Sequence, residues 1–129
     1  LRIVDYKTGG NPKIPANIEQ LFTPSETRPN YIFQTFLYAS IMCRQQTLKV
    51  APALLYIHRA ASDSYSPVIE MGEPRQPKIP VNNFTFFEDE FRKRLQTLLE
   101  EIFSENEPFT QTEDIKKCSY CDFKAICKR

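Results

Sequence analysis

The order of predicted elements in the first half of the sequence most restricts the fold. The sequence predicts a strand at residues 1–7 and a helix at residues 30–46, with Asn30 as the N-cap of the helix. It predicts a buried second strand at residues 51–58. A strand, a helix and a strand in succession form a crossover connection, which makes the two strands parallel within one sheet. We therefore expect an α/β fold that contains this parallel pair.

The second half of the sequence predicts the remaining sheet and a second helix. Residues 65–71 predict a weaker strand, and residues 72–83, with three prolines, an extended connector. Thr85 and Glu88 have the spacing of a capping box, and an amphipathic helix with Phe and Leu on one face follows them. We expect a small mixed sheet flanked by helices, with the two long helices on different faces.

Composition and charge exclude several classes of protein. Of the 129 residues, 41% are hydrophobic and 26% are charged, which argues against disorder, and the net charge of +1 argues against a globally basic nucleic-acid-binding surface. The sequence has neither an apolar run of membrane-spanning length nor a secretory signal, so we expect a cytoplasmic protein with no membrane partner. Because a strand pattern begins at the first residue, we expect the chain to be part of a longer polypeptide.

The first predicted strand ends in Asp5-Tyr6-Lys7, which carries the main functional signal. Side chains two apart on a strand share a face, so Asp5 and Lys7 point the same way. An aspartate there can hold a divalent cation such as Mg²⁺, and a lysine can stabilise charge that develops on a phosphate. An ordinary ion pair on a half-exposed strand would have the same pattern.

The wider context of this strand resembles a known nuclease family. Val4-Asp5-Tyr6-Lys7-Thr8-Gly9, followed by Gln34 and Tyr38 within Gln-Thr-Phe-Leu-Tyr-Ala, resembles the RecB-like branch of the PD-(D/E)XK nuclease superfamily. The resemblance implies a partial restriction-endonuclease-like core and a DNA nuclease dependent on Mg²⁺ or Mn²⁺. It also implies that Asp5 and the Tyr6 carbonyl bind the metal, that Lys7 is the motif lysine, and that Gln34 and Tyr38 support DNA binding beside the active site.

The family pattern also includes an acid on an earlier strand, which this sequence lacks. We therefore expect residues 1–109 to form the C-terminal part of a nuclease domain that is weak or inactive alone. The resemblance implies a bacterial helicase–nuclease that repairs double-strand breaks, with DNA, the upstream polypeptide and a helicase subunit as partners. An open sheet edge would also permit self-association. The alternative is a non-catalytic DNA-binding or scaffolding module.

Residues 110–129 form a cysteine-rich tail. Cys118, Cys121 and Cys127 follow a Cys-x₂-Cys-x₅-Cys spacing, which brings thiolates within reach of one metal. The tail resembles the three-cysteine group that holds a [4Fe–4S] cluster in some RecB-like nucleases, whose fourth ligand would lie upstream. Cys43 is a weaker candidate for that ligand. A zinc site and a tail without metal both remain open.

Overall fold

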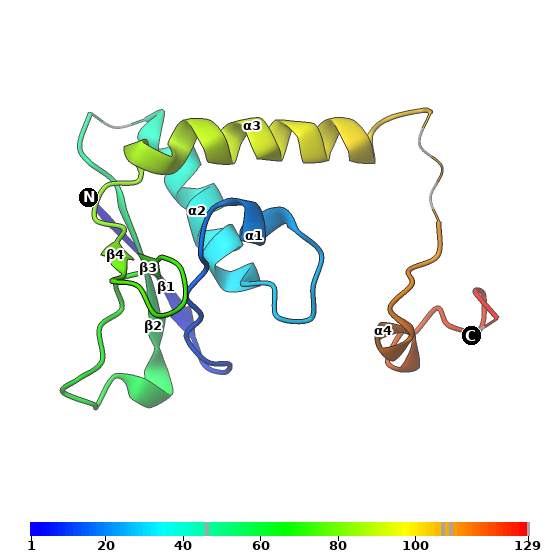
Figure 1. Ribbon diagram of the computed structural model, residues 1–129, viewed down its shortest axis with the longest axis horizontal. Coiled ribbons are helices and arrows are strands. Elements are labelled where there is room, and N and C mark those ends of the chain that lie inside the picture. The colour runs from blue at the N-terminus through cyan, green and yellow to red at the C-terminus, as the bar shows by residue number, and fades with distance from the viewer. Residues whose placement is uncertain (46, 107, 109, 129) are drawn as a thin grey trace. The chain divides into compact units, whose positions relative to one another are not determined.

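The structure is a computed structural model that describes residues 1–45, 47–106, 108 and 110–128 (Figure 1). The chain divides into two compact units, Leu1–Leu99 and Glu100–Arg129. The assignment of residues 1–109 and 110–129 to separate domains stays a prediction. Across the described ranges, no helix combines the length and the apolar character needed to cross a membrane.

A parallel strand pair with a crossover helix forms the centre of the first unit. Strand β1 (Arg2–Lys7) pairs in parallel with β2 (Ala51–Tyr56), in a register that sets Lys7 opposite Tyr56. Helix α2 (Asn30–Cys43) connects them and packs against both strands. The predicted α/β class and the predicted parallel pair are both confirmed.

The start of α2 differs from the prediction. Asn30 is the first helical residue and not its N-cap, because the helix is preceded by Pro29, whose carbonyl accepts from the amides of Ile32 and Phe33 at 3.0 and 3.1 Å. Proline suits this place, since its fixed φ leads into a helix. The helix ends at Cys43, and the predicted end at Gln46 lies outside the described residues.

A one-turn helix shortens the long loop before α2. Helix α1 (Glu19–Phe22) follows Asn17, whose side-chain oxygen accepts from the backbone amide of Gln20 at 3.1 Å. This turn brings the buried side chain of Leu21 into the core.

The predicted third strand is largely absent from the sheet of β1 and β2. Only β3 (Glu70–Met71) forms, and it pairs antiparallel with β4 (Ile79–Pro80) in a separate two-stranded sheet within the described part of the chain. A single bridge between Ala53 and Val68 links this segment to β2. Pro67 has no amide to donate, which explains why pairing along β2 stops at one bridge. The mixed α/β architecture with small sheets and helices is confirmed, but residues 65–71 do not join β1 and β2 in one sheet.

Strand β2 is also shorter than predicted. It ends at Tyr56, and the 3₁₀ turn η1 (Ile57–Arg59) follows, so His58 lies beyond the strand. The predicted strand of residues 51–58 is thus two residues too long. The turn exposes His58, whose ring makes an edge contact with Tyr56 at 6.0 Å between centroids.

An aromatic cluster forms the core and fixes the second long helix. Helix α3 (Thr85–Ile102) brings Phe91 against Phe36 of α2, with 5.9 Å between ring centroids, and against Phe22 of α1 at 5.3 Å. Phe36, Phe84 and Phe91 are fully buried. Helix α3 therefore packs on α2 and α1, and the prediction that it covers a second face of the sheet is wrong.

The ends of α3 also differ from the prediction. Thr85 lies inside the helix, and its amide donates to the side chain of Asn83, so Thr85 is not the N-cap of a capping box. The apolar face is buried only in its first half: Leu99 is 44% exposed and Ile102 is 46% exposed. Leu95 is the last residue of α3 that packs against the described core cluster.

The second unit contains one short helix. Helix α4 (Ile115–Ser119) is capped by Asp114, whose side chain accepts from the Lys117 amide at 3.4 Å. Burial alone would raise the pKa of Asp114, but the hydrogen bonds with Lys117 and Lys116 and the positive charge of Lys117 together lower it. The helix predicted around residues 123–127 is a series of turns instead.

The position of Phe91 in the aromatic cluster predicts a large effect on stability. We expect Phe91→Ala to lower the free energy of unfolding by about 3–5 kcal/mol, because it removes a fully buried ring from a packed core. The matched control is Phe86→Ala on the same helix, whose ring is 83% exposed and whose loss should change stability by less than about 0.5 kcal/mol. Urea denaturation measures both, and equal effects would contradict the packing.

Candidate active site

The C-terminal end of β1 carries an ion pair. Asp5 and Lys7 lie two residues apart on the strand, and the Lys7 Nζ is 2.8 Å from the Asp5 Oδ2. Their side chains are only 17% and 14% exposed, whereas Tyr6 between them is 64% exposed on the opposite side. The two side chains therefore project together, as strand alternation predicts.

Helix α2 extends this pair into a hydrogen-bonded network. The Lys7 Nζ donates to the Gln34 Oε1 at 2.8 Å, and the Gln34 Nε2 donates to the Tyr38 hydroxyl at 2.8 Å. Gln34 and Tyr38 are one helical turn apart and so share a face. The structure thus brings together the side chains of Asp5, Lys7, Gln34 and Tyr38, and Tyr6 lies between Asp5 and Lys7 on the strand. The roles of these five residues stay predictions.

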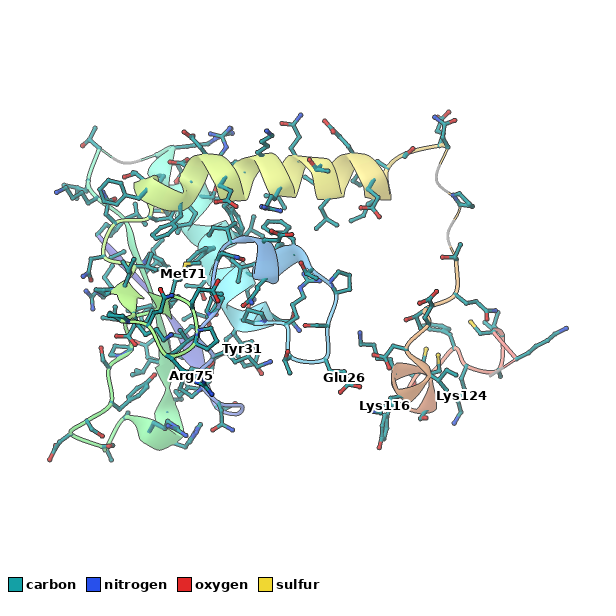
Figure 2. All side chains as sticks on the ribbon, viewed as in Figure 1. Glu26, Tyr31, Met71, Arg75, Lys116 and Lys124 are labelled. Atoms are coloured by element: carbon teal, nitrogen blue, oxygen red, sulfur yellow. The ribbon has the colours of Figure 1, made fainter. Side chains whose placement is uncertain are left out.

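Tyr31 is a further member of the network that the sequence analysis missed. The Lys7 Nζ lies 4.4 Å from the centroid of the Tyr31 ring, a cation–π distance. Figure 2 labels Tyr31. Tyr31 precedes Gln34 by three residues on α2, so the helical spacing that links Gln34 to Tyr38 also points to it. Lys7 is therefore held by a carboxylate, an amide oxygen and an aromatic ring.

The Asp5 carboxylate fits a divalent cation. Its Oδ2 is buried and has no hydrogen-bond partner among the described residues, although the Lys7 ammonium lies within ion-pair distance. The short contact with Lys7 is therefore a charge interaction without hydrogen-bond geometry. An anionic oxygen with unused acceptor capacity is a ligand that Mg²⁺ or Mn²⁺ prefers. Asp5 is the one carboxylate in the network described above.

Tyr56 is the last residue of β2, the strand that pairs with β1. It lies opposite Lys7 in the sheet register and is 2% exposed. Burial raises the pKa of its phenol, and the nearby groups Tyr65, Tyr31 and Asp5 raise it further. Tyr56 therefore stays neutral and does not compete with Asp5 for a cation.

The cysteine tail does not form a metal centre as it is folded. Cys118 lies in α4, and Cys121 and Cys127 lie in the turns after it. Among the residues that the structure describes, no three His, Cys, Asp or Glu side chains are grouped so that they could hold a metal ion. A metal-binding role for Cys118, Cys121 and Cys127 stays a prediction.

Cys43 behaves as a core residue. It packs against the hydrophobic cluster at the end of α2. Burial raises the pKa of its thiol, and the negative charge of Glu88 raises it further. Both effects disfavour the thiolate that binds metals, so the surroundings of Cys43 oppose a role as ligand.

Comparison with known proteins gives one match. The family model for the PD-(D/E)XK nuclease superfamily matches residues 1–128. No curated protein and no solved structure matches the chain. The matched range includes the strand end, α2 and the cysteine tail.

The surroundings of Cys43 predict slow alkylation. We expect iodoacetamide to modify Cys43 more slowly in the folded protein than in urea, with a pH profile shifted upward, because a raised pKa leaves less thiolate at a given pH. Glu88→Gln should move the profile partly back. Peptide mapping by mass spectrometry measures the rates, and identical profiles for folded and unfolded protein would contradict the assignment.

Proposed function

The chain belongs to the PD-(D/E)XK nuclease superfamily, and from this we propose that the end of β1 is the metal-binding part of a DNA nuclease active site. The observation that carries the proposal is the network of Asp5, Lys7 and Gln34, in which a carboxylate and an ammonium project together from one strand end. This pairing of charges suits phosphodiester hydrolysis. The carboxylate can bind a divalent metal ion, and the ammonium can bind a phosphate oxygen.

Each residue has a role in this proposal. Asp5 and the backbone carbonyl of Tyr6 would hold Mg²⁺ or Mn²⁺, and the ion would supply Lewis-acid chemistry toward a phosphodiester and a water. Lys7 exchanges its contact with Asp5 for a phosphate oxygen and stabilises the charge that develops there. Gln34 keeps the Lys7 ammonium in place, and Tyr38 fixes the orientation of the Gln34 amide.

The site as described contains a single anionic ligand, which limits its activity. A cation held by one carboxylate exchanges readily, because hard divalent ions need several oxygen ligands. We propose that this chain is weakly active alone and acts in a RecB-like helicase–nuclease of the bacterial cytoplasm. A further part of the polypeptide would supply the second acid, and a helicase subunit would deliver DNA from double-strand breaks.

The same observation supports a second candidate. A site with one carboxylate can bind a DNA strand through its cations without cutting it, so a non-catalytic DNA-binding or scaffolding module is the alternative. Metal-dependent hydrolysis that requires Asp5 separates the two functions.

Substitutions at the strand end test the nuclease proposal. We expect the chain, in molar excess over linear DNA with Mn²⁺, to degrade the DNA slowly, and Asp5→Asn or Lys7→Gln to reduce the rate by about 100-fold or more. Asp89→Asn and Lys93→Gln on α3 are matched controls that leave the rate unchanged. Equal rates for wild type and Asp5→Asn would reject the nuclease proposal. Rapid turnover by the wild type would reject only the expectation that this chain is weakly active alone.

Binding of Mn²⁺ gives an independent measurement. Electron paramagnetic resonance of free Mn²⁺ should show weak binding to the wild type that Asp5→Asn abolishes, because the substitution removes the anionic ligand. Binding that is unchanged by Asp5→Asn would place the cation elsewhere.

The tail cysteines are a separate candidate metal site. We retain as a proposal that the complete polypeptide arranges Cys118, Cys121 and Cys127 around a [4Fe–4S] cluster, with zinc as the competing ion. Anaerobic purification followed by metal analysis distinguishes the two ions. Iron and sulfide favour the cluster, and stoichiometric zinc favours the zinc site. A protein that contains none of them rejects both sites.

A further inference from the structure

A cavity of about 250 Å³ lies where the loop after β1 meets the start of α2. Its wall includes the cations Lys13 and Arg28 together with Asn11 and Tyr31. Among the described residues that line it, none is acidic. A concave surface with two cations and no carboxylate is suited to an anion.

Lys13 fixes the shape of this cavity. Its Nζ donates to the backbone carbonyls of Thr27 and Arg28, at 2.9 and 3.1 Å. These bonds tie the segment after β1 to the segment before α2, and they use two of the three N–H donors of the ammonium. The loop that carries Arg28 is therefore held in place before any ligand arrives.

Arg28 has an unused donor in this position. Its Nε is buried and has no hydrogen-bond partner within the described ranges, and its guanidinium lies 5.3 Å from the centroid of the Phe33 ring. A buried N–H of a charged group without an acceptor costs free energy. Because the Nε is closed to solvent, an anion in the cavity would meet the other N–H groups of the guanidinium, whose planar arrangement suits phosphate.

Tyr31 connects the cavity to the strand end. Its ring lines the cavity and also holds the Lys7 ammonium at 4.4 Å. Gly10 lies against the same ring: a Cβ there would be 3.0 Å from the Tyr31 Cε2, and its φ of +80° favours glycine. One aromatic side chain therefore forms a shared wall between the cavity and Lys7.

We propose that this cavity is a phosphate subsite, which holds a phosphodiester of the bound DNA strand while a neighbouring phosphate lies at Asp5 and Lys7. The inference rests on the proposed function and extends it by naming where the strand runs. Arg28 supplies the main contact, and Lys13 adds positive charge. Neither residue contacts the metal site in this proposal, so the subsite acts on binding and not on the chemical step.

Binding without metal isolates the subsite from catalysis. In EDTA, fluorescence anisotropy of a labelled single-stranded oligonucleotide should show that Arg28→Gln weakens binding about tenfold and reduces the slope of log K against log salt by about one. Arg44→Gln, at an exposed position after α2, is the matched control and should stay within about twofold of wild type. An Arg28→Gln protein with wild-type affinity and salt slope overturns the inference.

A second variant guards against a folding defect in Arg28→Gln. Asn11→Asp adds a negative charge to the cavity wall and keeps the side-chain oxygen that accepts from Arg59 at 3.2 Å. It should weaken oligonucleotide binding without lowering the thermal midpoint. The inference is also overturned if Asn11→Asp binds the oligonucleotide as tightly as wild type and Arg28→Gln loses binding only because it is unfolded.

Two further arms separate the outcomes. Inorganic phosphate at matched ionic strength should displace the oligonucleotide from the wild type more readily than from Arg28→Gln, because the subsite accepts the phosphate group itself. If cleavage never occurs but binding depends on Arg28, the subsite stands and the nuclease proposal fails. If cleavage depends on Asp5 but Arg28→Gln binds the oligonucleotide as tightly as wild type, the nuclease proposal stands and the subsite proposal fails.

Discussion

Parallel pairing between β1 and β2, with α2 packed across both, is the constraint on which the site depends. The register sets Lys7 opposite Tyr56, so the two strands end at one edge of the sheet. Helix α2 buries Ile32 and Phe36 in the core, and this fixes its rotation about its own axis. Gln34 and Tyr38 then face the strand end because no apolar partner competes for that side of the helix.

Lys7 links the end of β1 to helix α2. A flexible lysine side chain loses rotamer freedom when it is fixed, so a single exposed ion pair would contribute little. Here the ammonium meets a carboxylate, an amide oxygen and the face of Tyr31 at once, with little exposure to solvent. Three weak contacts on one group restrict it to one position. That position places the ammonium 2.8 Å from the buried Oδ2 of Asp5, which has no hydrogen-bond partner among the described residues.

The sequence was sufficient for features that depend on local periodicity. Alternation placed Asp5 and Lys7 on one side of a strand, and helical spacing placed Gln34 and Tyr38 on one face. The features it missed depend on contacts between distant segments. The separate sheet of β3 and β4 arises because Pro67 interrupts pairing with β2, and α3 packs on α2 because Phe91 finds an aromatic pocket there.

The cavity at Arg28 illustrates why such contacts escape a linear reading. Gly10, Lys13 and Arg28 carry no motif, and a basic residue in a polar loop is normally solvated. Only the hydrogen bonds from Lys13 to the backbone at 27 and 28 bring the two loops together, and only then is the Nε of Arg28 buried without an acceptor. Strand binding at such a cavity needs no metal. In the proposed arrangement, DNA affinity depends on Arg28 and metal-dependent turnover depends on Asp5, so affinity and turnover are properties of different residues.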